Sequence, residues 1–286
     1  MKDKLWRLIR LLVILLGIGI LIYPSLSQYL SEMNSSRATA SYDRSVEQME
    51  AEQLNELLMR AQEYNRRLAQ SSAGVPPRND EQGNPITPDD YWELLDVDGT
   101  GIIGYIYLPR FDTTIPIYHG TAEKVLQVGI GHLQNTSLPV GCSSTHAALS
   151  GHRGLPTHSL FTDLPQMQVG DSFFVKVLNQ TLCYTVDQIQ TVLPSEMNAL
   201  TIEEGKDYMT LITCTPYGVN SHRLLVRGVR SPLHAEQLEQ TDFQRGSFWS
   251  RLPAQYRHML LGAGVIVGAL ILRFLVGWLL KLRKRG

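Results

Sequence analysis

Two apolar runs, one near each end of the chain, constrain this sequence more than any other feature. Residues 11–23 carry no charge and follow a basic stretch that contains Lys2, Lys4, Arg7 and Arg10. With the apolar residues of that stretch included, the run reaches the roughly 20 residues that a helix needs to cross a bilayer. Residues 259–280 form the second run, and the basic tail 281–286 closes it. The pattern predicts a membrane segment near each terminus.

The basic residues flank each apolar run on its outer side. By the positive-inside rule, this predicts that both termini are cytoplasmic and that everything between the two runs lies outside the cell membrane. The small residues at 25–27 leave a second interpretation open, in which residues 1–27 are a cleaved secretory signal instead of an anchor. Arg273 interrupts the second run about 10 Å from its basic end, which is close enough for the side chain to snorkel.

Composition and motifs exclude several functional classes for the region between the runs. The formal net charge is −1, and no basic stripe predicts nucleic-acid binding. Neither a dinucleotide-binding nor a P-loop glycine pattern occurs. The three cysteines, Cys142, Cys183 and Cys214, follow no zinc-binding spacing. We therefore expect no nucleic-acid partner, no metal and no cofactor.

The region between the runs divides into four parts by composition. Residues 28–70 contain apolar side chains at helical spacing and predict one or two amphipathic helices. Residues 71–90 are rich in turn formers and predict an exposed, lid-like loop, and residues 233–258 a juxtamembrane linker. Residues 91–232 predict a closed or nearly closed β-barrel with a short helix at 122–128. Its expected strands are 101–108, 114–118, 172–178, 182–186, 188–193, 208–213 and 223–229.

The pattern in the barrel region that best indicates catalysis is a cysteine at the end of one predicted strand, followed by an arginine at the start of the next. A thiol with a pKa of about 8.5 is mostly protonated at neutral pH, so a nucleophilic Cys214 needs a basic or cationic neighbour. His152, flanked by Gly151 and Gly154, is a candidate base, although its spacing fits a surface-loop histidine equally well. Arg223 could stabilise an oxyanion or could be an ordinary strand-edge arginine.

The remaining histidines and cysteines are expected to have structural or surface roles and not catalytic ones. Cys142 and Cys183 are expected to be buried or bystander thiols. The other seven histidines are expected to be surface or capping residues, and His146 is the first of them to test because it lies near His152.

Several motifs resemble the class C, pilin-polymerising sortases of Gram-positive bacteria. The resemblance covers about residues 91–230, and both terminal apolar runs fit that class. Its main motifs are Thr210-Leu-Ile-Thr-Cys214 with Arg223, Pro116-Ile-Tyr-His-Gly-Thr121, Ser150-Gly-His-Arg-Gly-Leu-Pro156 and Leu224-Leu-Val-Arg-Gly228. The family pattern implies a mainly β fold, an eight-stranded barrel with N-terminal helices and a transmembrane segment near each terminus.

The resemblance also implies a chemistry. Cys214 is the expected nucleophile, His152 the general acid/base and Arg223 the oxyanion or substrate stabiliser, with Leu211 and Thr213 as substrate contacts. The implied partners are the membrane and pilins or other surface proteins that carry an Leu-Pro-x-Thr-Gly-like sorting signal. Two alternatives stay open: a sortase that anchors proteins to the cell wall, and a catalytically idle membrane scaffold. The chain lacks the Asp-Pro-aromatic lid motif of many class C members.

Overall fold

The computed structural model describes residues 2–71, 88, 90–155, 160–232, 262 and 264. Most of the expected lid-like loop and almost all of residues 233–286, which include the expected linker, C-terminal membrane helix and basic tail, lie outside the described residues. Leu30–Gln244 forms one compact unit, and residues 1–29 belong to a second.

Two helices make up the described N-terminal part of the chain. α1 (Lys2–Glu47) is continuous, so the expected boundary between residues 27 and 28 falls inside a helix, and α2 (Ala51–Gln70) follows after a short turn. Within the described residues, only α1 is long and apolar enough to cross a membrane. In its N-terminal part, Leu12, Leu16 and Ile20 are each more than half exposed. This helix is therefore a candidate membrane span.

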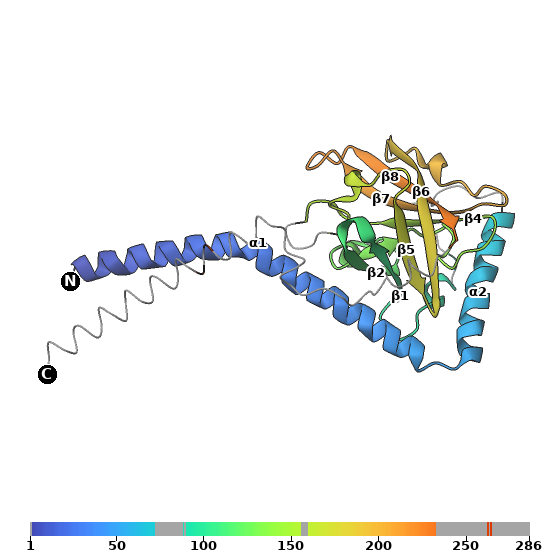
Figure 1. The fold of residues 1–286 in the computed structure, drawn as a ribbon, viewed down its shortest axis with the longest axis horizontal. Helices are drawn as coiled ribbons and strands as arrows, with labels where there is room; N and C mark the ends of the chain where they lie inside the picture. Colours follow the sequence, from blue (N-terminus) through green and yellow to red (C-terminus); the bar gives the residue numbers. More distant parts are fainter. Residues whose placement is uncertain are drawn as a thin grey trace. The chain divides into compact units, whose positions relative to one another are not determined.

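Eight strands form a closed barrel in the order β1-β2-β3-β4-β7-β8-β6-β5. The closed barrel was predicted from the sequence, and its eight strands agree with the number that the resemblance implied; Figure 1 shows the barrel beside α1 and α2. Neighbouring strands are antiparallel except for two parallel pairs, β2 with β3 and β4 with β7. The strands are β1 (Ile102–Leu108), β2 (Thr113–His119), β3 (Ile130–His132), β4 (Thr145–Ser150), β5 (Ser172–Val177), β6 (Gln180–Val192), β7 (Asp207–Thr215) and β8 (His222–Ser231). The short helices are α3 (Glu123–Leu126), η1 (Tyr91–Glu93), η2 (Pro109–Phe111), η3 (Leu164–Gln166) and η4 (Met197–Leu200).

The structure corrects two details of the strand prediction. The expected strands 182–186 and 188–193 are one strand, β6, because its pairing with β8 shifts register between Val186 and Gln188 instead of ending there. A bulge of this kind inserts a residue without breaking the strand. The sequence also missed β3 and β4. β4 contains adjacent alanines and is buried along most of its length, so it shows neither alternation nor a branched apolar run.

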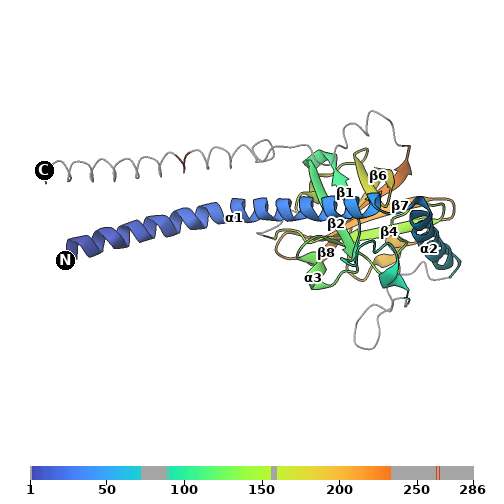
Figure 2. The ribbon, with the colours of Figure 1, turned by 90° about the horizontal axis from the view of Figure 1, so that it is seen from below.

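α2 packs through the apolar face that its sequence predicted. Leu54, Ala61 and Tyr64 are buried, and the figures show the helix beside β4 (Figures 1 and 2). Asn65 fixes its position through a two-way pair with the backbone of Leu138: its Nδ2 donates to the carbonyl at 3.0 Å, and its Oδ1 accepts from the N–H at 2.7 Å. The helix is therefore an integral part of the unit that contains the barrel.

A buried histidine joins the segment before the barrel to β3. Tyr91 Oη lies 2.8 Å from His132 Nδ1, and His132 Nε2 lies 2.9 Å from the carbonyl of Ser137. Because a carbonyl can only accept, Nε2 carries the proton and Nδ1 accepts from the tyrosine. His132 is fully buried, and this burial lowers its pKa from 6.5 to about 4. The ring is therefore neutral in the folded protein at neutral pH.

This histidine predicts an acid-sensitive fold. Below pH 6.5 the unfolded chain takes up a proton that folded His132 takes up only near pH 4, so stability falls as the pH drops through this window. The expected loss at this one site is roughly 3 kcal/mol. Urea unfolding from pH 7 to pH 4 measures it, and His132→Gln should flatten the pH dependence, whereas His222→Gln, at a partly exposed position, should not. An unchanged slope in His132→Gln would contradict the assignment.

Candidate active site

The parallel pairing of β4 with β7 brings two distant stretches of the chain to one edge of the barrel. Ser150 pairs with Ile212, and the N–H of Gly151 donates to the carbonyl of Ile212 at 3.0 Å. Two residues beyond this register pair, the chain has left β4 and reaches His152, while β7 reaches Cys214. Since parallel strands end at the same edge of a sheet, the candidate base and the candidate nucleophile lie at one edge of the barrel.

Position 151 has no room for a side chain, so it requires glycine. A Cβ at this position would come within 2.7 Å of Cδ2 of Phe161 and 2.8 Å of Cγ2 of Ile130. The Phe161 ring and the Ile130 side chain both belong to the packed core, so moving either of them would cost free energy. The glycine before His152 therefore lets the chain leave β4 close to the barrel wall and carry the histidine to the edge.

Cys214 and Arg223 are directly opposite each other on the antiparallel pair β7 and β8. Directly opposed residues of such a pair project from the same face of the sheet. Nη1 of Arg223 donates to the carbonyls of Asn220 and His222, both at 3.1 Å, which holds the guanidinium beside the turn that joins the strands. Cys214 is partly exposed. A thiol and a fixed cation thus share one face of the barrel edge.

Arg153 links the loop after β4 to the loop after β7. Its Nη1 donates to Oγ1 of Thr215 at 3.3 Å, and its guanidinium lies 5.8 Å from the ring centre of Tyr217. Gly154, with φ of +82°, lies so close to Tyr217 that a Cβ would come within 2.3 Å of the ring. These contacts tie the residue after His152 to the residue after Cys214, so the two loops hold each other in place.

Glu123 and Arg153 were not among the candidate residues from the sequence. Glu123, at the start of α3, places Oε2 at 3.5 Å from Nε2 of His152. Nothing in the spacing of the two residues pointed to this contact, because they lie on different elements. Arg153 was visible inside the Ser150–Leu155 motif, but its contacts with Thr215 and Tyr217 depend on the barrel closing.

The structure places Leu211 and Thr213, the expected substrate contacts, inside the barrel wall. Leu211 is 0% exposed and Thr213 is 1% exposed, so neither has surface to offer a peptide in this conformation. Oγ1 of Thr213 instead donates to the carbonyl of Gly151 at 2.8 Å. The threonine before Cys214 therefore clamps β7 to the residue before His152.

The structure also corrects the expectation for several histidines. His119, His132 and His146 are buried, not exposed. The ring of His146 lies between Oγ1 of Thr210 at 2.7 Å and the carbonyl of Thr201 at 3.0 Å. Burial lowers its pKa. His146 is thus fixed inside the barrel wall, with both ring nitrogens engaged.

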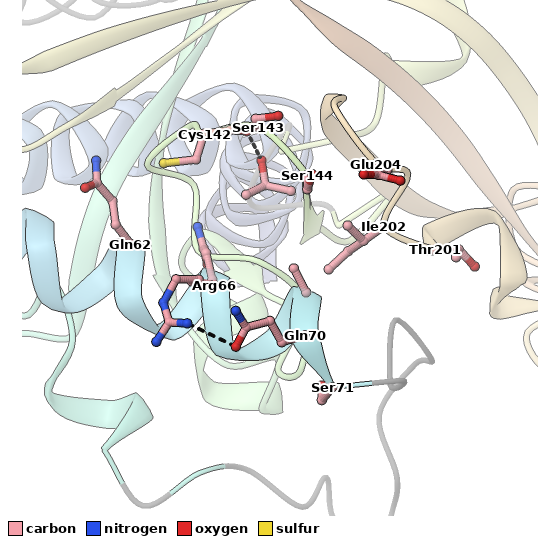
Figure 3. A pocket seen from close by; sticks show the side chains of 13 residues that line it. Gln62, Arg66, Gln70, Ser71, Cys142, Ser143, Ser144, Thr201, Ile202 and Glu204 are labelled. Carbon is pink, nitrogen blue, oxygen red and sulfur yellow. Dashed lines mark hydrogen bonds between the residues drawn. The ribbon is translucent and has the colours of Figure 1, made fainter.

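The other two thiols lie away from this edge. Cys183 is buried in β6, whereas Cys142 is exposed before β4, at the opposite end of the β4/β7 pair from Cys214. Partial burial, and after it the charge of Asp207, raises the pKa of the Cys142 thiol. It lines a cavity of about 790 Å³ between α2 and the loops before β4 and β7, among hydroxyl and amide side chains (Figure 3). Among the described residues, no group of three or more His, Cys, Asp or Glu side chains could hold a metal ion.

Comparisons with known proteins identify the family to which this chain belongs. The Sortase domain family matches residues 106–231. Sortase C1 of Streptococcus agalactiae shares 48% identity at a TM-score of 0.63 and covers 69% of this chain and 100% of its own. A sortase C of Streptococcus pneumoniae, described for its pilin substrate specificity, shares 42% identity at a TM-score of 0.60 and covers 69% of this chain and 97% of its own.

Among curated proteins, sortase A of Staphylococcus aureus is 24% identical over 220 residues, which span 75% of this chain and 88% of that protein. Sortase A of Bacillus anthracis is 27% identical over 132 residues, which span 46% of this chain and 61% of that protein. The chain belongs to the sortase family and is a sortase-type cysteine transpeptidase. Its neighbours of known structure are class C sortases of streptococci.

Proposed function

We propose that this chain joins surface proteins through a thioester on Cys214 and that its products are pilin polymers. The observation that carries the proposal is the strand register: β4 pairs with β7, so His152, two residues beyond β4, lies at the barrel edge near the end of β7, where Cys214 is opposite Arg223 of β8. The similarity to class C structures supports pilins as the substrates.

In the first half of the proposed reaction, the Cys214 thiol gives its proton to His152. The sulfur attacks the carbonyl carbon of the threonine in an Leu-Pro-x-Thr-Gly-like signal, and the resulting oxyanion faces Arg223. The bond between threonine and glycine then breaks, and the imidazolium of His152 protonates the departing glycine amine. The threonine remains bound to Cys214 as a thioester.

In the second half, a lysine amine of another pilin attacks the thioester carbonyl. The amine loses a proton to His152, the bond between carbon and sulfur breaks, and the thiolate of Cys214 leaves and recovers the proton. The product is an isopeptide bond between two subunits. A cell-wall amine or a water molecule could resolve the same thioester, so the acceptor distinguishes the possible reactions.

Mass spectrometry of the full-length chain in detergent, incubated with a sorting-signal peptide and a candidate pilin, tests the proposal. An isopeptide-linked adduct is the expected result. Transfer only to wall-type amines or water would replace pilin polymerisation with wall anchoring or hydrolysis. If Cys214 forms no acyl adduct at all, the chain is a scaffold and the proposed function is wrong.

Arg223 provides a second, more local test. The guanidinium has five N–H donors in a planar fork, and the two carbonyls of the turn occupy Nη1. We expect Arg223→Ala to lower the rate of acyl-enzyme formation by about 10²- to 10³-fold, as for the loss of an oxyanion donor. Arg223→Lys should recover only part of this loss because an ammonium lacks the fork.

Arg230→Lys is the matched control, since Arg230 lies on the same strand at its other end and stacks 5.6 Å from the ring centre of Tyr184. The rate of acyl-enzyme formation in Arg230→Lys should equal that of the parent chain. Single-turnover kinetics with a sorting-signal peptide measures all three variants. A parental rate in Arg223→Ala would show that the oxyanion is stabilised by other groups.

We also propose that the N-terminal part of α1 anchors the chain in the cell membrane, with the barrel outside the cell and the terminus in the cytoplasm. The exposed apolar side chains of that part and the preceding basic residues support this orientation. Protease treatment of intact cells should digest the barrel. Protection of the barrel until the cells are opened would contradict the orientation.

A further inference from the structure

The two nitrogens of the His152 ring have different surroundings. Nε2 is shielded from solvent and makes no regular hydrogen bond within the described part of the chain, although the side chain as a whole is 28% exposed. Its near neighbour is Oε2 of Glu123, at 3.5 Å. A shielded ring nitrogen whose near neighbour is a carboxylate oxygen is best satisfied as an N–H that points at that carboxylate.

The carboxylate itself is oriented by its own helix. Nε2 of Gln127, one turn further along the chain, donates to Oε1 of Glu123. This leaves Oε2 as the oxygen that faces the histidine. The hydrogen bond from Gln127, and to a smaller extent the charge of His152, lowers the pKa of Glu123. Glu123 is therefore ionised at neutral pH and presents a negative charge to one side of the imidazole.

The other charged or titratable groups around His152 come from different elements. Arg153 follows it in the chain and turns toward Thr215, while Cys214 and Arg223 stand at the ends of β7 and β8. Arg153 and Arg223 bring positive charge to this edge, and Glu123 brings negative charge. Among the described residues, the carboxylate of Glu123 is the one that faces His152, so it compensates the positive charge that the imidazole gains when it takes the thiol proton.

We propose that Glu123 is a positioning residue for His152. Its carboxylate holds the tautomer with the proton on Nε2 and leaves Nδ1 to exchange a proton with Cys214 and the substrate amine. It also stabilises the imidazolium that each half-reaction forms, as an acidic residue does beside other catalytic histidines. This inference rests on the proposed role of His152, and it adds a residue of α3 to the machinery at the ends of β4, β7 and β8.

Glu123→Gln tests the inference, because the amide keeps the shape and removes the charge. The carboxylate is 70% exposed, so solvent screening limits the effect. We expect kcat for the sorting-signal peptide to fall about two- to fivefold with KM unchanged. The alkaline limb of the pH profile should move to lower pH, since without the carboxylate the imidazolium is lost sooner. Glu56→Gln, an exposed position on α2, is the charge-matched control and should behave as the parent chain.

A second readout needs no sorting signal. In a Cys142→Ala background, which removes the other exposed thiol, the rate of Cys214 alkylation by iodoacetamide reports the thiolate that the imidazolium supports. We expect Glu123→Gln to slow alkylation at pH 7 by about twofold when His152 is present and to have no effect in His152→Ala. A purely structural role would produce the same loss in both backgrounds.

The two readouts separate this inference from the proposed function. If the parent chain forms no transfer product but Glu123→Gln still slows alkylation only when His152 is present, the proposed function fails and the inference stands. If Glu123→Gln matches Glu56→Gln in alkylation rate and pH profile, or slows alkylation equally in His152→Ala, the inference is overturned whatever the substrate.

Discussion

Replacing Cys214 with alanine is expected to abolish formation of the acyl-enzyme and to lower turnover by about 10⁴-fold or more, because no other group in this edge can form the thioester. The side chain is partly exposed and opposite Arg223, so the substitution removes the nucleophile with little change in packing. Intact-protein mass spectrometry after incubation with a sorting-signal peptide measures the adduct directly.

Cys142→Ala is the matched control for this experiment. Cys142 is also exposed, but it lines the cavity beside α2 at the other end of the β4/β7 pair. The adduct should form in this variant as in the parent chain. Turnover that survives in Cys214→Ala, or an adduct that disappears in Cys142→Ala, would move the nucleophile away from Cys214.

Tyr42→Ala is expected to destabilise the barrel by about 3–5 kcal/mol, the cost of removing a large buried aromatic side chain. Tyr42 lies on α1 and is 0% exposed. Its Oη donates to the carbonyl of Ile103 at 3.2 Å and accepts from the N–H of Leu178 at 2.8 Å. The ring also meets Tyr105 edge to face at 6.3 Å. One side chain thus fills a core site and completes two backbone hydrogen bonds.

Thermal unfolding of the full-length chain in detergent measures this loss as a fall in Tm of about 10 °C. Tyr42→Phe should cost less, about 1–3 kcal/mol, since it leaves the two backbone groups unpaired but keeps the ring. Arg44→Ala, at an exposed position two residues further along α1, should change Tm little. A Tm in Tyr42→Ala equal to that of Arg44→Ala would show that the end of α1 does not support the barrel.

The adjacent residue extends the same contact. Asp43 accepts from Oη of Tyr105 at 2.9 Å and pairs with Nζ of Lys176 at 3.0 Å. With Tyr42, it connects α1 to two neighbouring strands of the barrel. The C-terminal part of α1 is therefore a structural element of the unit that contains the barrel.

Local patterns account for the features that the sequence predicted well. The strand that ends in Cys214 and the strand that begins near Arg223 are joined by a short turn, and their branched and apolar residues define the pairing. The cross-strand pair of Cys214 and Arg223 follows from that hairpin alone. The apolar face of α2 was likewise visible at helical spacing, and the structure confirms that it packs.

Long-range pairing decided the rest. The bond from Thr213 to Gly151 joins residues that are 62 positions apart, and it exists only because β4 runs parallel to β7. A parallel pair needs a long crossover, so no turn sets its register and no local pattern reveals it. β4 itself gave no strand signal. The spacing of residues therefore could not predict that His152 and Cys214 lie at one edge of the barrel, or that Glu123 contacts His152.

The sequence by itself determined the thiol, the guanidinium, the apolar N-terminal segment and the mainly β character, because each depends on residue type or on neighbours close in the chain. Only the tertiary structure decided that the end of β4 lies beside the end of β7, which carboxylate faces His152 and how α1 supports the barrel. Closure of the barrel fixes these contacts, since it aligns strand ends from distant parts of the chain at one edge.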